Sequence, residues 1–137
     1  MKMDLQALQI FLAEQFPQGA RFGQIEAAGD GWAHFRLPIS DEHLRPGATV
    51  SGPSLMALAD VALYGALLSR IGPVALAVTI NLNINFLRKP SPERDILAKA
   101  SMLKVGRRLG MGEVYLYSEG NDDPVAHATL TYSIPEH

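Results

Sequence analysis

Residues 53–70 read PSLMALADVALYGALLSR, and this segment decides the fold. Apolar side chains stand at nearly every position, so a helix formed here has no wet face and must be buried on most sides. Pro53 suits the first position of a helix, and Gly72-Pro73 favours its end. The sequence therefore predicts one long helix over residues 53–70 at the centre of the protein.

Four strands are expected after this helix. In residues 78–87, apolar side chains alternate with Thr79 and three asparagines, which is the period of a strand with one apolar face. Three further segments read as strands: residues 96–105, 110–118 and 124–134. Turn sequences at 106–109 and 120–123 separate them. Consecutive strands without intervening helices favour an antiparallel sheet.

The residues before the central helix add a helix and a hairpin. Apolar residues at helical spacing predict a helix over residues 4–16 that Asp4 caps and Pro17 ends. Residues 22–28 and 32–37 read as strands joined by a Gly-Asp-Gly turn, and residues 38–50 as a loop. We therefore expect an α+β fold, in which an antiparallel sheet wraps around a long central helix, with an extra N-terminal helix.

Composition narrows the functional classes. The chain has 137 residues, 47% of them hydrophobic and 19% charged, which indicates one globular domain spanning residues 1–137. A net charge of -2 argues against a broad basic face for nucleic acid. The absence of cysteine excludes disulfides, thiolate zinc sites and cysteine nucleophiles. The histidines show no metal-ligand spacing, and no phosphate-binding or dinucleotide glycine motif occurs.

Membrane and export signals are not expected either. The N-terminal residues carry Asp4 and Glu14 and lack a cleavage site of small residues after an apolar run. The longest apolar stretch, residues 55–68, contains Asp60 and is shorter than the ~20 residues of a spanning helix. The expected location is therefore the cytoplasm, with neither nucleic acid nor membrane as a partner.

Asp60 is the one charged residue between Ser54 and Ser69. An ionised carboxylate is rarely buried without a partner, because desolvation is costly. One interpretation is structural: the carboxylate binds a local backbone amide or lies at a gap in the sheet. The other is functional: Asp60 is a general base or nucleophile in a pocket between helix and sheet.

The loop before the central helix offers backbone donors. Residues 47–52 read GATVSG and lead directly into the helix, whose first amides favour developing negative charge. Because Pro53 has no N–H, an oxyanion donor would be Gly52 or a residue from Ser54 onward. The simpler interpretation is that Ser51 caps the helix.

These residues together resemble a known family. Residues 45–53 (RPGATVSGP) and Leu58-Ala59-Asp60 resemble the N-x-x-G-x-x-H-G-G…L-x-D motif of the hotdog-fold acyl-CoA thioesterases, in the phenylacetyl-CoA-type branch. Residues 78–88 (VTINLNINFLR), 105–110 (VGRRLG) and 126–132 (AHATLTY) are similar to the branch's central strand, next turn and last strand. The resemblance covers roughly residues 20–134.

The resemblance implies a fold, an assembly and a site. Family members wrap an antiparallel sheet around a long helix, dimerise by joining sheets edge to edge, often pair into tetramers, and place their active sites at the dimer interface. Asp60 falls on the family's catalytic carboxylate, and Gly52 on the glycine whose N–H polarises the thioester carbonyl. Thr79 falls on a Ser or Thr that positions the attacking water.

Other positions depart from the family or extend its site. Arg45 replaces the motif's asparagine, Ser51 its histidine and Pro53 its second glycine. Arg45 could pair with Asp60, grip an acidic acyl group, or point into water. Four basic residues flank the two turns near which the family holds the nucleotide end of coenzyme A: Arg88, Lys89, Arg107 and Arg108. The alternative is that they are ordinary surface charges.

The resemblance therefore implies hydrolysis of an acyl-CoA or related thioester, with Asp60, Gly52 and Thr79 as catalytic residues. The resemblance implies no cofactor other than coenzyme A as part of the substrate, and a homodimer that forms a dimer of dimers. A non-catalytic acyl-thioester binding protein is the alternative, favoured by the departures at positions 45, 51 and 53. A dehydratase is a third, weaker hypothesis, because that chemistry needs a histidine at position 51.

Trp32 and Tyr64 are expected in the core, and His127 in a structural role.

Overall fold

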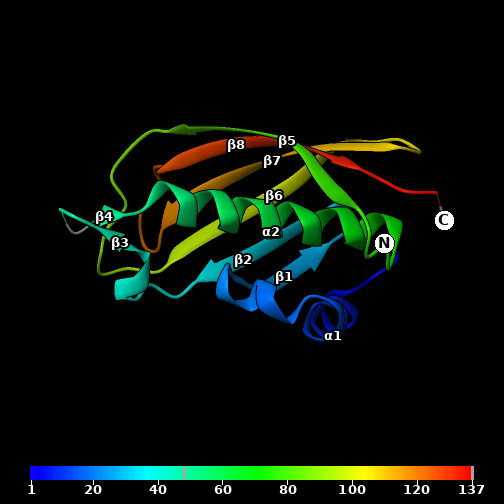
Figure 1. Cartoon of the computed structure of the whole chain (residues 1–137), viewed down its shortest axis with the longest axis horizontal. Coiled ribbons are helices and arrows are strands. Elements are labelled where there is room, and N and C mark those ends of the chain that lie inside the picture. Colours follow the sequence, from blue (N-terminus) through cyan, green and yellow to red (C-terminus); the bar gives the residue numbers. More distant parts are fainter. Residues whose placement is uncertain (48, 137) are drawn as a thin grey trace.

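In the computed structural model, which describes residues 1–47 and 49–136, six strands form one antiparallel sheet with a long helix against it (Figure 1). The strand order is β1-β2-β6-β7-β8-β5. The strands are β1 (Gln24–Gly29), β2 (Trp32–Leu37), β5 (Val78–Phe86), β6 (Ile96–Val105), β7 (Leu109–Ser118) and β8 (Ala126–Ser133). The expected α+β class and the sheet around one helix are confirmed. Ala48, within the motif at 45–53, lies outside the described residues.

Helix α2 (Gly52–Ile71) is the centre of the core, and twelve of its residues are buried. Ser51 caps it, with its hydroxyl accepting a hydrogen bond from the Ser54 N–H at 3.3 Å. Gly72 ends it at a φ of 93°, a conformation that favours glycine. Gly65 allows close packing on the sheet, because a Cβ there would lie 2.7 Å from the Phe35 ring. The predicted helix is confirmed and is one residue longer at each end.

Helix α2 is longer than the apolar stretch of residues 55–68, which was judged too short to span a membrane. Its 20 residues, with a mean hydropathy of 1.4 over the most apolar window, suffice by length and composition to cross a membrane. However, 67% of that window is buried inside the protein. Its apolar character is therefore explained by the sheet that covers it.

Helix α1 (Leu5–Gln15) lies beside β1 and the end of α2 (Figure 1). Asp4 caps it as expected, its carboxylate accepting a hydrogen bond from the Ala7 N–H at 2.9 Å. Leu8 is the one fully buried side chain of α1. The chain does not simply leave the helix at Pro17, because residues Pro17–Arg21 form a short 3-10 helix, η1, beneath the central helix.

Two further sequence predictions are wrong. The segment 38–50, expected as a loop, contains the 3-10 turn η2 (Asp41–His43) and a small hairpin, β3 (Leu44–Arg45) with β4 (Thr49–Val50). Trp32, expected in the core, is 38% exposed. Alternation along β2 explains this, since Ala33, Phe35 and Leu37 take the buried face and Trp32 the opposite one.

Strand β5 is an edge strand whose apolar side chains are only partly covered. One side of it pairs with β8, and the sheet ends there. Leu82 and Ile84 pack half-buried on the core, but Val78, Ile80 and Phe86 are all more than half exposed. A bulge between Thr79 and Asn81 shifts the alternation at its start. An open edge lined with apolar side chains is typical of a surface that another strand covers.

Candidate active site

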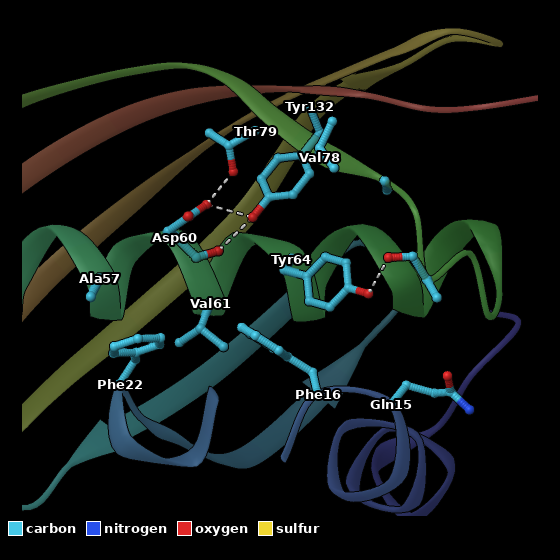
Figure 2. A pocket seen from close by; sticks show the side chains of 12 residues that line it. Gln15, Phe16, Phe22, Ala57, Asp60, Val61, Tyr64, Val78, Thr79 and Tyr132 are labelled. Carbon is cyan, nitrogen blue, oxygen red and sulfur yellow. Dashed lines mark hydrogen bonds between the residues drawn. The ribbon is translucent and has the colours of Figure 1, made fainter. Parts of the chain in front are cut away.

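Asp60, on α2, is held by two hydroxyl groups from the sheet. Thr79 Oγ1 and Tyr132 Oη each donate a hydrogen bond to Asp60 Oδ1 at 2.5 Å, and Tyr132 Oη also lies 2.9 Å from the Asp60 carbonyl oxygen (Figure 2). Thr79 of β5 and Tyr132 of β8 are cross-strand partners. One rung of the sheet therefore supplies both donors to one carboxylate oxygen.

The protonation of this cluster follows from its burial. Burial raises the pKa of the Tyr132 phenol well above its usual value, and the nearby charge of Asp60 raises it further. The phenol therefore stays protonated and donates to the carboxylate. The second carboxylate oxygen, Oδ2, accepts no hydrogen bond from residues 1–47 or 49–136. Asp60 thus has one fixed oxygen and one oxygen available for chemistry.

Asp60 lines a partly open cavity of about 420 Å³. The cavity lies between α2, the junction of α1 with η1, and the start of β5 (Figure 2). Phe16, Phe22 and Val61 form much of its apolar wall, and Tyr64 adds an aromatic ring one helical turn beyond Asp60. Among the described lining residues, Asp60 carries the one charge. A carboxylate in an apolar cavity is the arrangement that the functional interpretation requires.

Tyr132 is the site residue that the sequence prediction missed. In β8, every second residue points into the core, and the buried positions are Ala126, Ala128, Leu130 and Tyr132. A buried phenol needs a hydrogen-bond partner, and the buried acid of the central helix is an obvious acceptor. The signal was therefore the pairing of a buried tyrosine with a buried aspartate.

Replacing Tyr132 by phenylalanine tests whether its hydroxyl positions the carboxylate. A hydrogen bond to a charged group contributes roughly 1.5–3 kcal/mol. For the thioester hydrolysis expected from the sequence, we therefore expect Tyr132→Phe to lower kcat by about ten-fold or more, with little change in KM. Kinetics and thermal unfolding are measured together, with Tyr64→Phe as the control, because the Tyr64 hydroxyl binds the Ala75 carbonyl and not Asp60. Equal losses of kcat in the two variants would contradict a positioning role.

One chain does not bring Gly52 to Asp60. Gly52 begins α2, and Asp60 follows eight residues later, which is about 12 Å along the helix axis. Gly52 instead packs near the end of β5, where a Cβ would lie 3.2 Å from Phe86 Cζ. Ser51 has the capping role described above, so its simpler interpretation is confirmed.

The predicted basic residues are also separated within a chain. Arg45 is exposed on β3 and is not among the residues that line the Asp60 cavity. Arg88 and Lys89 follow β5 and lie beside a smaller cavity with Arg94. Arg107 and Arg108 lie in the β6–β7 turn, at the opposite end of strands about 30 Å long. One chain therefore does not join the four residues into one phosphate site.

No group of three or more metal-ligating side chains occurs in the described part of the chain. His127, on β8, pairs with Glu113 at 2.8 Å and packs against the Tyr115 ring in a tilted contact, which agrees with its expected structural role. Tyr64 is buried as expected, although it also lines the cavity.

Comparison with known proteins identifies the family. The model of the thioesterase superfamily matches residues 47–125. A candidate thioesterase from Silicibacter sp. TM1040 shares 48% identity and a TM-score of 0.89, covering 97% of this chain and 92% of its own. A mutant of the phenylacetic acid degradation protein PaaI from Thermus thermophilus shares 28% identity and a TM-score of 0.74, covering 85% of this chain and 96% of its own.

A third structure shows the fold alone. It is a hypothetical thioesterase from Streptococcus pneumoniae, solved with coenzyme A, with 19% identity, a TM-score of 0.80, and coverage of 91% of this chain and 98% of its own. A search of curated proteins finds no match. The family match spans more than half of the chain, includes Gly52 and Asp60, and agrees with the observed helix and sheet. The chain therefore belongs to the thioesterase superfamily and has its hotdog fold.

Proposed function

We propose that this protein hydrolyses an acyl-CoA thioester, with Asp60 as the general base or the nucleophile. The observation that carries the proposal is the Asp60 carboxylate, which Thr79 and Tyr132 hold by one oxygen at the wall of an apolar cavity. Membership of the thioesterase superfamily supports the reaction class. Thr79 then acts through the carboxylate it orients, and it lines the same cavity, where it can also contact the attacking water.

The reaction balances in either of two ways. As a general base, Asp60 takes a proton from water while the water oxygen attacks the carbonyl carbon. The tetrahedral oxyanion then collapses, the C–S bond breaks, and the thiolate leaves and is protonated. As a nucleophile, Asp60 forms a mixed anhydride as the thiolate leaves, and water then cleaves that anhydride. Both routes need a donor for the oxyanion.

A second copy of the chain supplies that donor in our proposal. If two β5 edges pair antiparallel about a two-fold axis, the Phe86 end of one strand lies beside the Thr79 end of the other. Gly52 packs near Phe86, and Thr79 binds Asp60. The pairing therefore brings Gly52 of one copy toward Asp60 of the other. The open, apolar edge of β5 supports such an interface.

The same pairing unites the basic residues. Arg88 and Lys89, which follow the Phe86 end of β5, approach the end of the second copy that carries Arg107 and Arg108. Four cations distributed over two chains suit the phosphates of coenzyme A. This arrangement would explain why one chain shows no continuous basic site.

A panel of acyl-CoA substrates tests the proposal. Released coenzyme A is measured with a disulfide reagent, and the protein contributes no background because it has no cysteine. We expect turnover of at least one acyl-CoA and its loss in Asp60→Asn. Tight binding without turnover would instead select the non-catalytic binding protein, which the substitutions at Arg45, Ser51 and Pro53 favour.

Arg45 gives a separate prediction about the acyl group. Its side chain is exposed on the β3–β4 hairpin, which projects from the rest of the fold (Figure 1). We therefore expect Arg45→Asn to leave the ratio of rates on dicarboxylic and monocarboxylic acyl-CoAs unchanged. A fall in that ratio of ten-fold or more would show instead that Arg45 grips an acidic acyl group.

A further inference from the structure

The lining of the Asp60 cavity restricts the acyl groups that can occupy it. Beyond Asp60, the apolar part of the wall includes Phe16, Phe22, Ala57 and Val61. The other polar side chains that line the cavity are uncharged: Gln15, Tyr64, Thr79 and Tyr132. No lysine, arginine or histidine is among its described lining residues. A carboxylate on the acyl group would meet the like charge of Asp60 and would lose its hydration without a cation in return. An uncharged, apolar acyl group would gain from the same desolvation.

A second cavity, of about 410 Å³, lies on the other side of Phe16. It lies between α1, η1 and the start of β1, is partly open to solvent, and its apolar wall includes Leu12, Pro17 and Ile25. The two cavities share two described lining residues, Phe16 and Val61. These side chains therefore form the partition between them.

Local structure fixes the Phe16 ring in the partition. Phe16 is the C-terminal cap of α1, and its N–H donates to the Leu12 carbonyl at 2.9 Å. The Phe16 and Tyr64 rings make a T-shaped contact with centroids 6.2 Å apart. The ring also lies on Gly19, where a Cβ would come within 2.5 Å of it. Its position is thus set by a helix end, an aromatic neighbour and a glycine.

We propose that the Asp60 cavity takes an uncharged apolar acyl group and that Phe16 limits the length of that group. This inference rests on the thioesterase function proposed above. The acyl chain enters beside Asp60, runs along Val61 and stops at the Phe16 ring. Removing the ring would leave Val61 as the rest of the partition and would open a way toward a second cavity of nearly the same volume. Phe16 is then a specificity-determining residue.

Phe16→Ala in the full chain tests this role. The kcat/KM values are measured for straight-chain acyl-CoAs from butyryl to palmitoyl, with glutaryl-CoA as the acidic substrate. Because each further buried methylene contributes roughly four-fold in binding, we expect the optimum to move to longer chains, and the ratio of long-chain to short-chain kcat/KM to rise about ten-fold or more. Glutaryl-CoA should be the poorest substrate of its length in both proteins.

Phe11→Ala is the matched control. Phe11 is also a half-buried phenylalanine of α1 that packs against the core, but it is not among the described residues that line either cavity. We expect this variant to unfold at a lower temperature without a change in chain-length preference. Phe16→Leu, which retains part of the partition, should lie between wild type and Phe16→Ala. A uniform loss across the series in Phe16→Ala, or an equal shift in Phe11→Ala, would overturn the inference.

Binding separates this inference from the proposed function. Calorimetry with thioether analogues of the same acyl-CoAs, which cannot be hydrolysed, reports the acyl subsite without turnover. If binding shows the chain-length shift but no thioester is hydrolysed, the hydrolase proposal fails and the subsite stands. If hydrolysis occurs but neither rates nor binding shift, the role of Phe16 fails alone.

Discussion

Asp60→Asn is expected to lower kcat for thioester hydrolysis by roughly 10²- to 10⁴-fold, the range associated with loss of a positioned acid or base. An asparagine has nearly the same shape, and its side-chain oxygen can still accept the hydrogen bonds from Thr79 and Tyr132. The variant should therefore fold normally. What it loses is the negative charge that takes a proton from water or attacks the carbonyl.

The measurement is the rate of coenzyme A release, together with thermal unfolding. Asp122→Asn is the control, because it makes the same chemical change at an exposed aspartate in the β7–β8 turn, and its rate should match that of wild type. Retention of most of the activity by Asp60→Asn would show that the carboxylate has a structural role only. Thioester hydrolysis would then need another catalytic group.

Gly52→Pro is expected to lower kcat by about 10²- to 10³-fold, as removal of one oxyanion donor does in other enzymes. Proline lacks the N–H and suits the first turn of a helix, and the restriction that Pro53 places on a residue with a Cβ at position 52 applies equally to the alanine control below. Position 52 is the first residue of α2, and the preceding Ser51 has a ψ of 147°, which suits a residue before proline. A Cβ at position 52 would lie 3.2 Å from Cζ of Phe86, whose side chain is exposed.

Gly52→Ala separates the N–H from the added bulk. It places a Cβ at the same 3.2 Å from Phe86 but keeps the amide hydrogen. We expect this variant to keep most of the wild-type kcat. Similar losses in both variants would point to the contact with Phe86, and the oxyanion role of Gly52 would be wrong.

Mixing the two inactive variants tests whether the site spans two chains. After subunit exchange at equal amounts, a hybrid of Asp60→Asn with Gly52→Pro has one site in which both Asp60 and Gly52 are intact. If the site is shared as proposed, the mixture should recover about a quarter of the wild-type activity. A site contained in one chain would recover none, because each chain still carries its own defect.

The sequence predicted the features that single residues determine locally. Pro53 and Gly72 placed the ends of α2 to within one residue, and strict apolar content predicted its burial. Asp60 stood out because a charge inside such a helix needs a partner. These inferences depend on short-range backbone preferences and on burial, which a sequence displays directly.

The missed features depend on how distant segments align. Contact of Tyr132 with Asp60 requires the register in which Thr79 faces Tyr132, and that register is set by a bulge. Trp32 is different, because the alternation of Ala33, Phe35 and Leu37 with His34 and Arg36 already predicts an exposed position for it, and only its large apolar ring suggested the core. Cavities beside Phe16 depend on the angle at which α1 leaves the core, for which sequence periodicity carries no signal.

The unequal anchoring of the two helices bears on how such a protein can change over generations. Helix α1 contributes one fully buried side chain, Leu8, whereas α2 contributes twelve buried residues. Most substitutions along α1 should therefore perturb the folding free energy little. Because this lightly held helix ends at the cavity wall, mutation there can retune the preferred molecule while the reacting groups stay untouched. Divergence among relatives should accordingly concentrate in their first twenty or so positions.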